Sequence, residues 1–91
     1  MISPERWQGF EKRYQLLTIM AEFERARSAE EAGVREHMLQ ALQNALALID
    51  LTIDDPKWLS NLAILFGLRD EVARFYIGER KDSVAVLSRS L

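Results

Sequence analysis

Apolar residues recur every three or four positions through most of this chain, and that spacing is the strongest constraint on its fold. This period places apolar side chains along one side of an α-helix, whereas a half-buried strand would alternate every second residue. Only four glycines and two prolines interrupt the 91 residues, so the helices have few places to end. The sequence therefore predicts an all-α fold: one domain over residues 1–91, a small bundle of three long helices and a short C-terminal helix.

The first helix is predicted to begin at Ser3, Pro4 and Glu5 and to run to about Ala26. Serine caps a helix, proline fits its first turn, and glutamate suits the positive end of the helix dipole. Its apolar residues form two adjoining stripes that cover over half the circumference, which exceeds the usual apolar face. We expect this helix to be central in the bundle or to be covered by a second chain. The stripes are Trp7, Phe10, Tyr14, Leu17 and Ala21, and Leu16, Ile19, Met20 and Phe23.

Ser28 and Glu31 have capping-box spacing and predict the start of a second, amphipathic helix of about 20 residues. Asp55 and Pro56 predict the third, with the aspartate as N-cap and the proline in the first turn. Gly78 is its expected stop. Seven residues should share its apolar face: Trp58, Leu62, Leu65, Phe66, Val72, Ala73 and Tyr76.

A short last helix is expected from about Asp82. It would carry Val84, Leu87 and Leu91 on one side.

The stretch "FGLRDEVARFY", residues 66–76, conflicts with this pattern because Arg69 falls in the middle of the apolar face of the third helix. One interpretation is that Gly67 bends or breaks the helix, or allows a close helix contact, with Asp70 capping a new helix after the break. Another is that the Arg69 stem lies along the apolar face while its charged head reaches water.

Two further patterns overlap this stretch. "LAILFGLRDEV" is similar to a helix-turn-helix, but Asp70 and Glu71 would oppose contact with phosphates. "DPKWLSNLAILFG" looks like the start of a tetratricopeptide hairpin, but only one copy is present and such repeats need stacked neighbours.

"GLRDEVARFY", with residues 35–50 before it, resembles the signature of HEPN domains, which are helical bundles of bacterial toxins and nucleotidyltransferase partners. Arg69, Asp70 and Tyr76 match that signature, and Arg74 stands where its histidine is expected. In the nuclease members the arginine and the histidine act together on RNA. The resemblance therefore implies an inactive or divergent HEPN-like protein that acts by binding.

No catalytic group, metal site or cofactor is expected. His37 is the only histidine, there is no cysteine, and no phosphate-binding or dinucleotide-binding motif occurs. A net charge of −2 gives no reason to expect a nucleic-acid partner. The longest apolar run is residues 62–66, too short to cross a membrane, and no secretory signal is visible. The lack of cysteine fits a cytoplasmic location.

The leading hypothesis is a small non-catalytic helical interaction protein that associates with itself or with a protein partner. Surplus apolar surface on the first and third helices motivates it. The candidate interface residues are Trp7, Phe10, Tyr14, Phe23, Ile64, Leu68 and Phe75. Arg69, Arg74 and Tyr76 form a candidate polar site.

Overall fold

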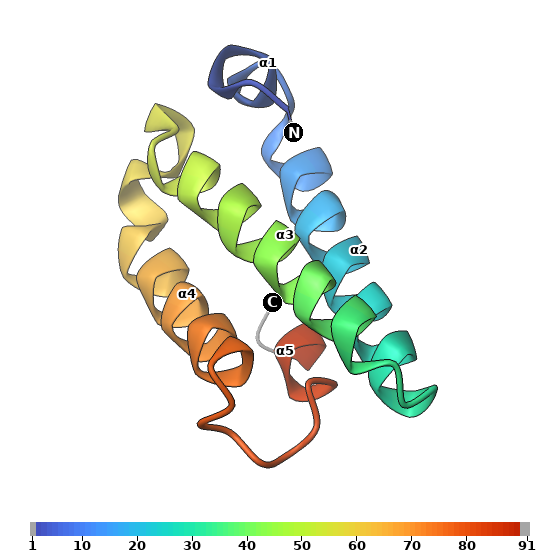
Figure 1. The fold of residues 1–91 in the computed structure, drawn as a ribbon. Coiled ribbons are helices and arrows are strands. Elements are labelled where there is room, and N and C mark those ends of the chain that lie inside the picture. Colours follow the sequence, from blue (N-terminus) through green and yellow to red (C-terminus); the bar gives the residue numbers. More distant parts are fainter. Residues whose placement is uncertain (1, 90–91) are drawn as a thin grey trace.

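The computed structural model of the protein describes residues 2–89 and confirms the all-α fold (Figure 1). No strand occurs in these residues. The elements in chain order are α1 (Pro4–Gln8), α2 (Lys12–Glu31), α3 (Arg35–Ile53), the 3₁₀ helix η1 (Pro56–Asn61), α4 (Leu62–Tyr76) and α5 (Val86–Arg89).

Helix α3 is the central helix, with α2 on one side and α4 on the other (Figure 1). Helix α5 contacts both α2 and α4, and α1 packs against α3. Of the two alternatives expected for the first long helix, the central position is therefore wrong, and cover by a second chain stays a prediction. One apolar cluster joins these elements, and its fully buried members include Ile19, Phe23, Leu42, Ile49 and Val72.

The first helix begins as predicted but is interrupted. Ser3 Oγ accepts a hydrogen bond from Arg6 N at 3.2 Å, so serine is the cap. The helix ends at Gln8 with Gly9 as its C-cap, and α2 starts afresh at Lys12. Glycine is a weak helix former, and the break lets α1 fold across the end of α3.

The predicted helix start at Ser28 is wrong, because Ser28 and Glu31 lie in the last turn of α2. The helix ends instead at Glu31, and Gly33, just after the C-cap Ala32, has a φ of +73°. Val34 N donates to Ala29 O and Gly33 N donates to Glu30 O, the two bonds of a Schellman motif. A glycine at positive φ therefore sets the boundary, and α3 begins at Arg35 without a side-chain cap.

Asp55 is the N-cap of the third predicted helix, and its carboxylate accepts from Lys57 N at 3.0 Å. The residues after it form η1 first, and the α-helical part begins only at Leu62. Gly78, with a φ of +81°, is the stop that the sequence predicted.

Helix α4 runs without a break through Gly67, so the predicted bend is wrong. Gly67 is exposed, has no positive φ, and has nothing within 4 Å of where a Cβ would stand. A close helix contact at this glycine is therefore also excluded within the described chain. The helix-turn-helix and tetratricopeptide interpretations each require a turn in this region, and α4 has none.

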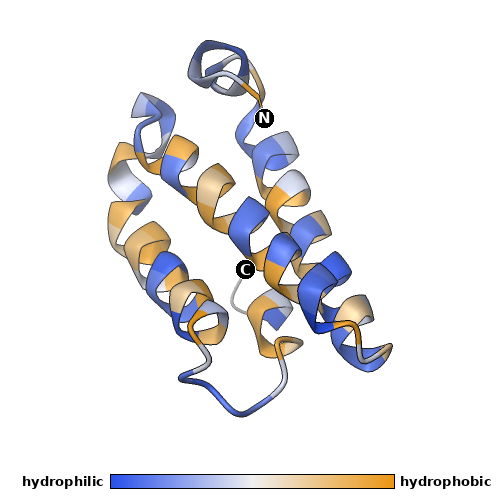
Figure 2. Cartoon of the chain, in the orientation of Figure 1, coloured by the Kyte–Doolittle hydropathy of each residue, from blue (hydrophilic) through white to orange (hydrophobic). Residues whose placement is uncertain are grey.

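The core face of α4 is rotated relative to the prediction. Leu65, Leu68, Val72 and Phe75 are buried, whereas Phe66 is 54% exposed. Figure 2 shows the first turns of α4 as hydrophobic all around the helix, and for this reason the apolar pattern alone pointed to the wrong side. The rotation moves Arg69 from the middle of a buried face to its edge.

The last helix starts later than predicted. It occupies Val86–Arg89 rather than starting near Asp82. Val84 and Leu87 are buried as predicted, and Leu91 lies outside the described residues.

Candidate functional site

The side of α4 that faces away from the core carries a continuous row of residues, none of which is buried. We call it the α4 outer face. Leu62, Ala63, Phe66, Arg69, Asp70, Ala73, Tyr76 and Ile77 make it up. Phe66, Tyr76 and Ile77 are 54%, 37% and 70% exposed. Removing such large apolar side chains from water would lower the free energy of the protein. These three residues give the α4 outer face an exposed apolar surface.

Arg69 lies midway along the length of this face, at the edge that is next to α3. Its Nε donates to Asp50 Oδ1 at 2.5 Å, and its Nη2 approaches Asp50 Oδ2 at 3.5 Å. The hydrogen bond to Asp50 raises the pKa of the Arg69 guanidinium, and the charge of the same carboxylate adds to the effect. The arginine therefore lays its stem at the edge of the apolar surface and keeps its head in water, as the second interpretation expected.

Arg69, Arg74 and Tyr76 do not converge on one site. Arg74 Nε pairs with Asp70 at 3.2 Å, one turn earlier on the same helix, and Arg74 Nη1 approaches Glu71 at 4.0 Å. Positions 69 and 74 differ by 140° around a helix of 100° per residue, so the two guanidinium groups leave α4 in different directions. Only Arg69 and Tyr76 belong to the α4 outer face.

The candidate interface residues divide into two groups. Tyr14 and Ile64 are exposed, at 53% and 62%, and Phe10 is half-buried against the core. The others are core residues, so they cannot line an interface of the folded chain, and their selection was wrong. Trp7, Phe23, Leu68 and Phe75 are each at most 4% exposed.

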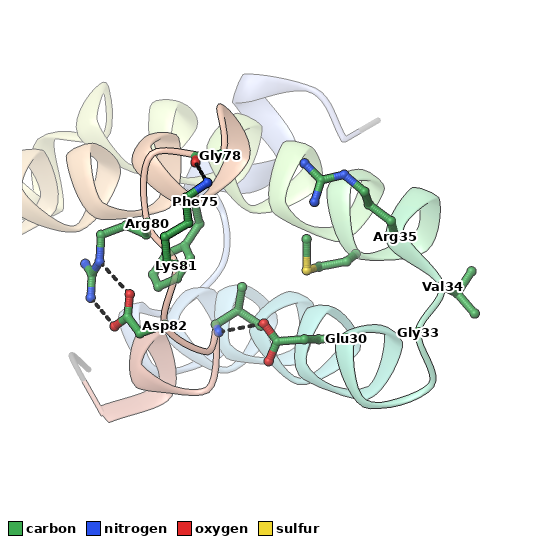
Figure 3. A pocket seen from close by; sticks show the side chains of 11 residues that line it. Glu30, Gly33, Val34, Arg35, Phe75, Gly78, Arg80, Lys81 and Asp82 are labelled. Atoms are coloured by element: carbon green, nitrogen blue, oxygen red, sulfur yellow. Dashed lines mark hydrogen bonds and ion pairs between the residues drawn. The ribbon is translucent and has the colours of Figure 1, made fainter.

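A hollow of 360 Å³ lies between the α2–α3 turn, the end of α4 and the segment after α4 (Figure 3). Glu30 closes one side by accepting from Val84 N at 3.1 Å. Lys81 Nζ donates to Gly78 O at 3.2 Å, at the negative end of α4. Both charges thus have structural partners that hold the chain end against the bundle.

Arg80, on the same side of the hollow, is also used structurally. Its guanidinium lies 4.6 Å from the Phe75 ring centroid and pairs with Asp82 and with Glu71. The hydrogen bond from Arg80 lowers the pKa of Asp82. The charged residues that line this hollow therefore serve to hold the segment after α4 against the end of the bundle.

A groove runs between α2 and α3, with two hollows of 430 and 650 Å³ that share Glu22 and Asn44. The Glu22 side chain is only 10% exposed. Its Oε2 accepts from Arg25 Nη1 at 2.7 Å, while its Oε1 is covered and has no donor among the described residues. Because Oε1 is covered, the carboxylate would have to rotate before it could meet a ligand.

The junction of α1, α2 and η1 holds a buried polar cluster that sequence reasoning did not identify. We call it the Asp55 junction. Gln15 is fully buried, and its Nε2 donates to Trp7 O at 2.8 Å and to Asp55 Oδ2 at 2.9 Å. Its Oε1 accepts from Trp58 Nε1 at 2.7 Å. Every hydrogen-bonding atom of this amide therefore has a partner, which identifies the residue as structural.

Two more contacts complete the Asp55 junction. Trp7 Nε1 donates to Thr52 Oγ1 at 3.1 Å, and Thr52 donates to Leu48 O at 2.8 Å. Lys57 Nζ bridges Asp55 Oδ2 and Gln8 O. A helical wheel places Gln15 on the same side of α2 as Ile19, and that position was the signal available in the sequence.

No group of three or more His, Cys, Asp or Glu residues that could hold a metal ion occurs between residues 2 and 89. Within the same residues, no helix has the length and hydrophobicity needed to cross a membrane. Comparison with protein-family models, with curated proteins and with solved structures finds no match for this chain.

Proposed function

We propose that this protein is a small, non-catalytic helical interaction protein that associates with itself through the α4 outer face. One observation carries the proposal: Phe66, Tyr76 and Ile77 stay exposed along one side of a helix whose opposite side already packs on the core. Exposed apolar surface of this kind is typical of a contact with another protein.

A second candidate surface for self-association lies on α2. Tyr14 and Leu17 are each 53% exposed there. Two large apolar side chains are exposed on α2, and Tyr14 already packs on the Phe10 ring at 4.6 Å between centroids, whereas the α4 outer face exposes three, Phe66, Tyr76 and Ile77. We therefore assign the self-association to α4.

Light scattering over a range of micromolar concentrations tests the proposal. We expect the mass to rise toward at least twice the 10.5 kDa of one chain. Phe66→Gln should weaken the association, and Leu17→Gln is its matched control because the two side chains have nearly equal exposure, 54% and 53%. A wild type that stays monomeric at every concentration would remove self-association from the proposal, and loss of the dimer in Leu17→Gln alone would move it to α2.

The non-catalytic part of the proposal has its own test. Purified protein incubated with single-stranded RNA, with and without Mg²⁺, should leave the RNA intact. Arg69, the arginine matched in the resemblance to HEPN domains, is held by Asp50 and has no histidine partner. Reproducible cleavage that is lost in Arg69→Ala would replace this proposal with an RNase function.

A further inference from the structure

From the buried and half-paired carboxylate of Glu22 we infer a binding site for a small organic amine in the groove between α2 and α3. The amine places its ammonium group on Glu22 and its apolar body in the 650 Å³ hollow that this side chain lines. None of the residues that line the hollow belongs to α4. The inference therefore goes beyond the proposed self-association and does not depend on it.

Glu22 carries an unused acceptor in the wall of the groove. Its side chain is 10% exposed, and Arg25 Nη1 meets only Oε2, at 2.7 Å. The other oxygen, Oε1, is buried and has no donor among residues 2–89. An ionised carboxylate only accepts hydrogen bonds, and a buried acceptor without a donor is unfavourable. The group that would complete this site is a hydrogen-bond donor, and a positively charged donor would bind more strongly than a neutral one.

The contact with Arg25 leaves room for such a ligand. The Arg25 side chain is 67% exposed, so it reaches Glu22 from the solvent side of the groove. The last torsion of a glutamate side chain is broad, and turning the carboxylate to present Oε1 to the groove therefore needs little energy. The long, exposed arginine side chain can follow Oε2 as the group turns.

Of the two hollows that Glu22 lines, the larger one suits an amine. Phe10 and Tyr14 line it with ring centroids 4.6 Å apart, and Tyr14 is 53% exposed. Aromatic rings attract cations and also pack on apolar groups. The one basic residue among those that line it is the exposed Arg6, whereas both Arg25 and His37 line the 430 Å³ hollow. An organic cation is therefore expected in the larger hollow, whose volume is typical of small-molecule sites.

A divalent metal ion fits this position less well. Glu22 supplies the only carboxylate among the residues that line the larger hollow, while Mg²⁺ and Ca²⁺ are usually held by several oxygen ligands. A single carboxylate beside aromatic rings matches one ammonium group on an apolar body.

Three ligands with the same body and different head groups test the inference: phenethylamine, phenethyl alcohol and hydrocinnamate. At neutral pH their head groups are positive, neutral and negative. Isothermal titration calorimetry should show that the amine binds at least tenfold more tightly than the alcohol, and that the acid does not bind. For ligands this small we expect dissociation constants in the millimolar range. Equal affinity for amine and alcohol, or no binding of the amine at millimolar concentrations, overturns the inference.

Glu22→Gln keeps the size of the side chain and removes its charge. It should reduce the affinity for phenethylamine to that for phenethyl alcohol. Glu24→Gln is the matched control, because Glu24 also pairs with an arginine three residues later but is 54% exposed, and it should leave both affinities unchanged. An amine preference that survives in Glu22→Gln overturns the inference. Thermal melts without ligand verify that both variants are folded, and if Glu22→Gln is not, the head-group series in the wild type decides.

Nuclear magnetic resonance tests the location. On addition of phenethylamine, the backbone amide signals of Phe10, Tyr14 and Thr18 should shift more than those of His37 and Ala41, which line the other hollow. The reverse pattern overturns the choice of hollow. Shifts confined to the α4 outer face would overturn the site altogether, because Glu22 would then not be involved.

Discussion

The Asp55 junction and the middle turns of α4 both place a polar residue where the sequence pattern calls for an apolar one, and they resolve the conflict in opposite ways. At the junction, Gln15 and Asp55 are at most 2% exposed, and hydrogen bonds satisfy them within the fold. On α4, the Arg69 side chain stays 43% exposed and makes an ion pair with the 51% exposed Asp50.

Burial decides where a polar residue matters for stability. A buried polar group left without its partner costs about 1–3 kcal/mol, while an exposed ion pair contributes about 0–1 kcal/mol. The junction is therefore expected to hold the fold together, and the outer side of α4 to tolerate change. Glu22 is intermediate between these cases, because its side chain is buried but only one of its two carboxylate oxygens has a hydrogen-bond donor.

Asp55→Ala should have the largest effect. Asp55 caps η1 and accepts from Gln15 and Lys57. Losing a cap costs about 1 kcal/mol, and the unpaired Gln15 amide adds to it, so we expect a loss of about 3 kcal/mol in the free energy of unfolding. Urea denaturation measures it. Asp54→Ala is the control, since Asp54 is the exposed neighbour, and equal losses in both variants would show that the junction carries no special stability.

The same carboxylate should make stability depend on acid. Burial by itself would raise the pKa of Asp55, but hydrogen bonds from Lys57 and Gln15 outweigh it and hold the pKa below its ordinary value. A lowered folded pKa stabilises the protein above the unfolded pKa of about 3.9, and this contribution disappears as pH falls through the folded pKa. The difference in melting temperature between wild type and Asp55→Asn should thus be constant near neutral pH and shrink below about pH 4. A difference that grows in acid would contradict this assignment.

Glu22→Met should stabilise the protein by about 1 kcal/mol, because it removes a buried oxygen that has no donor. The lost Arg25 pair offsets little of this, since the Arg25 side chain is 67% exposed and pairs three residues apart on a helix contribute little. Glu24→Met is a close control: Glu24 also pairs with an arginine three residues later but is 54% exposed. Thermal melts should rise for the first variant and fall slightly for the second. A fall for both would mean that Glu22 Oε1 has a partner in solution.

The sequence predicted well where local chemistry decides structure. Ser3, Asp55 and Gly78 act as the caps or stop that were expected, because each works through its own backbone or the next turn. It failed at Ser28, where a capping pattern competes with burial of the neighbouring Ala26 and Ala29 against the bundle. Packing between distant segments can override a local capping signal, and a local sequence pattern does not report such packing.

The candidate site shows the same limit. Helix α4 is apolar on more than one side, so periodicity could not tell the core residue Leu68 from the surface residue Phe66. That choice depends on where α3 lies. Likewise, Gln15 and Asp55 are 40 positions apart, and only the folded chain shows that they share a hydrogen bond.

Gly67→Ala should have the smallest effect on the free energy of unfolding, because this position has none of the buried hydrogen bonds found at the Asp55 junction. Gly67 lies in a regular, exposed part of α4, and a Cβ there would meet nothing within 4 Å. Alanine restricts the unfolded chain more than glycine and favours the helix, so we expect a gain between about 0.5 and 1 kcal/mol. Gly78→Ala is the matched control, because its φ of +81° disfavours any side chain and should make that variant less stable. A thermal melt that falls for Gly67→Ala would show that the helix is not regular at this point, and Arg69 would then need an explanation other than its pair with Asp50.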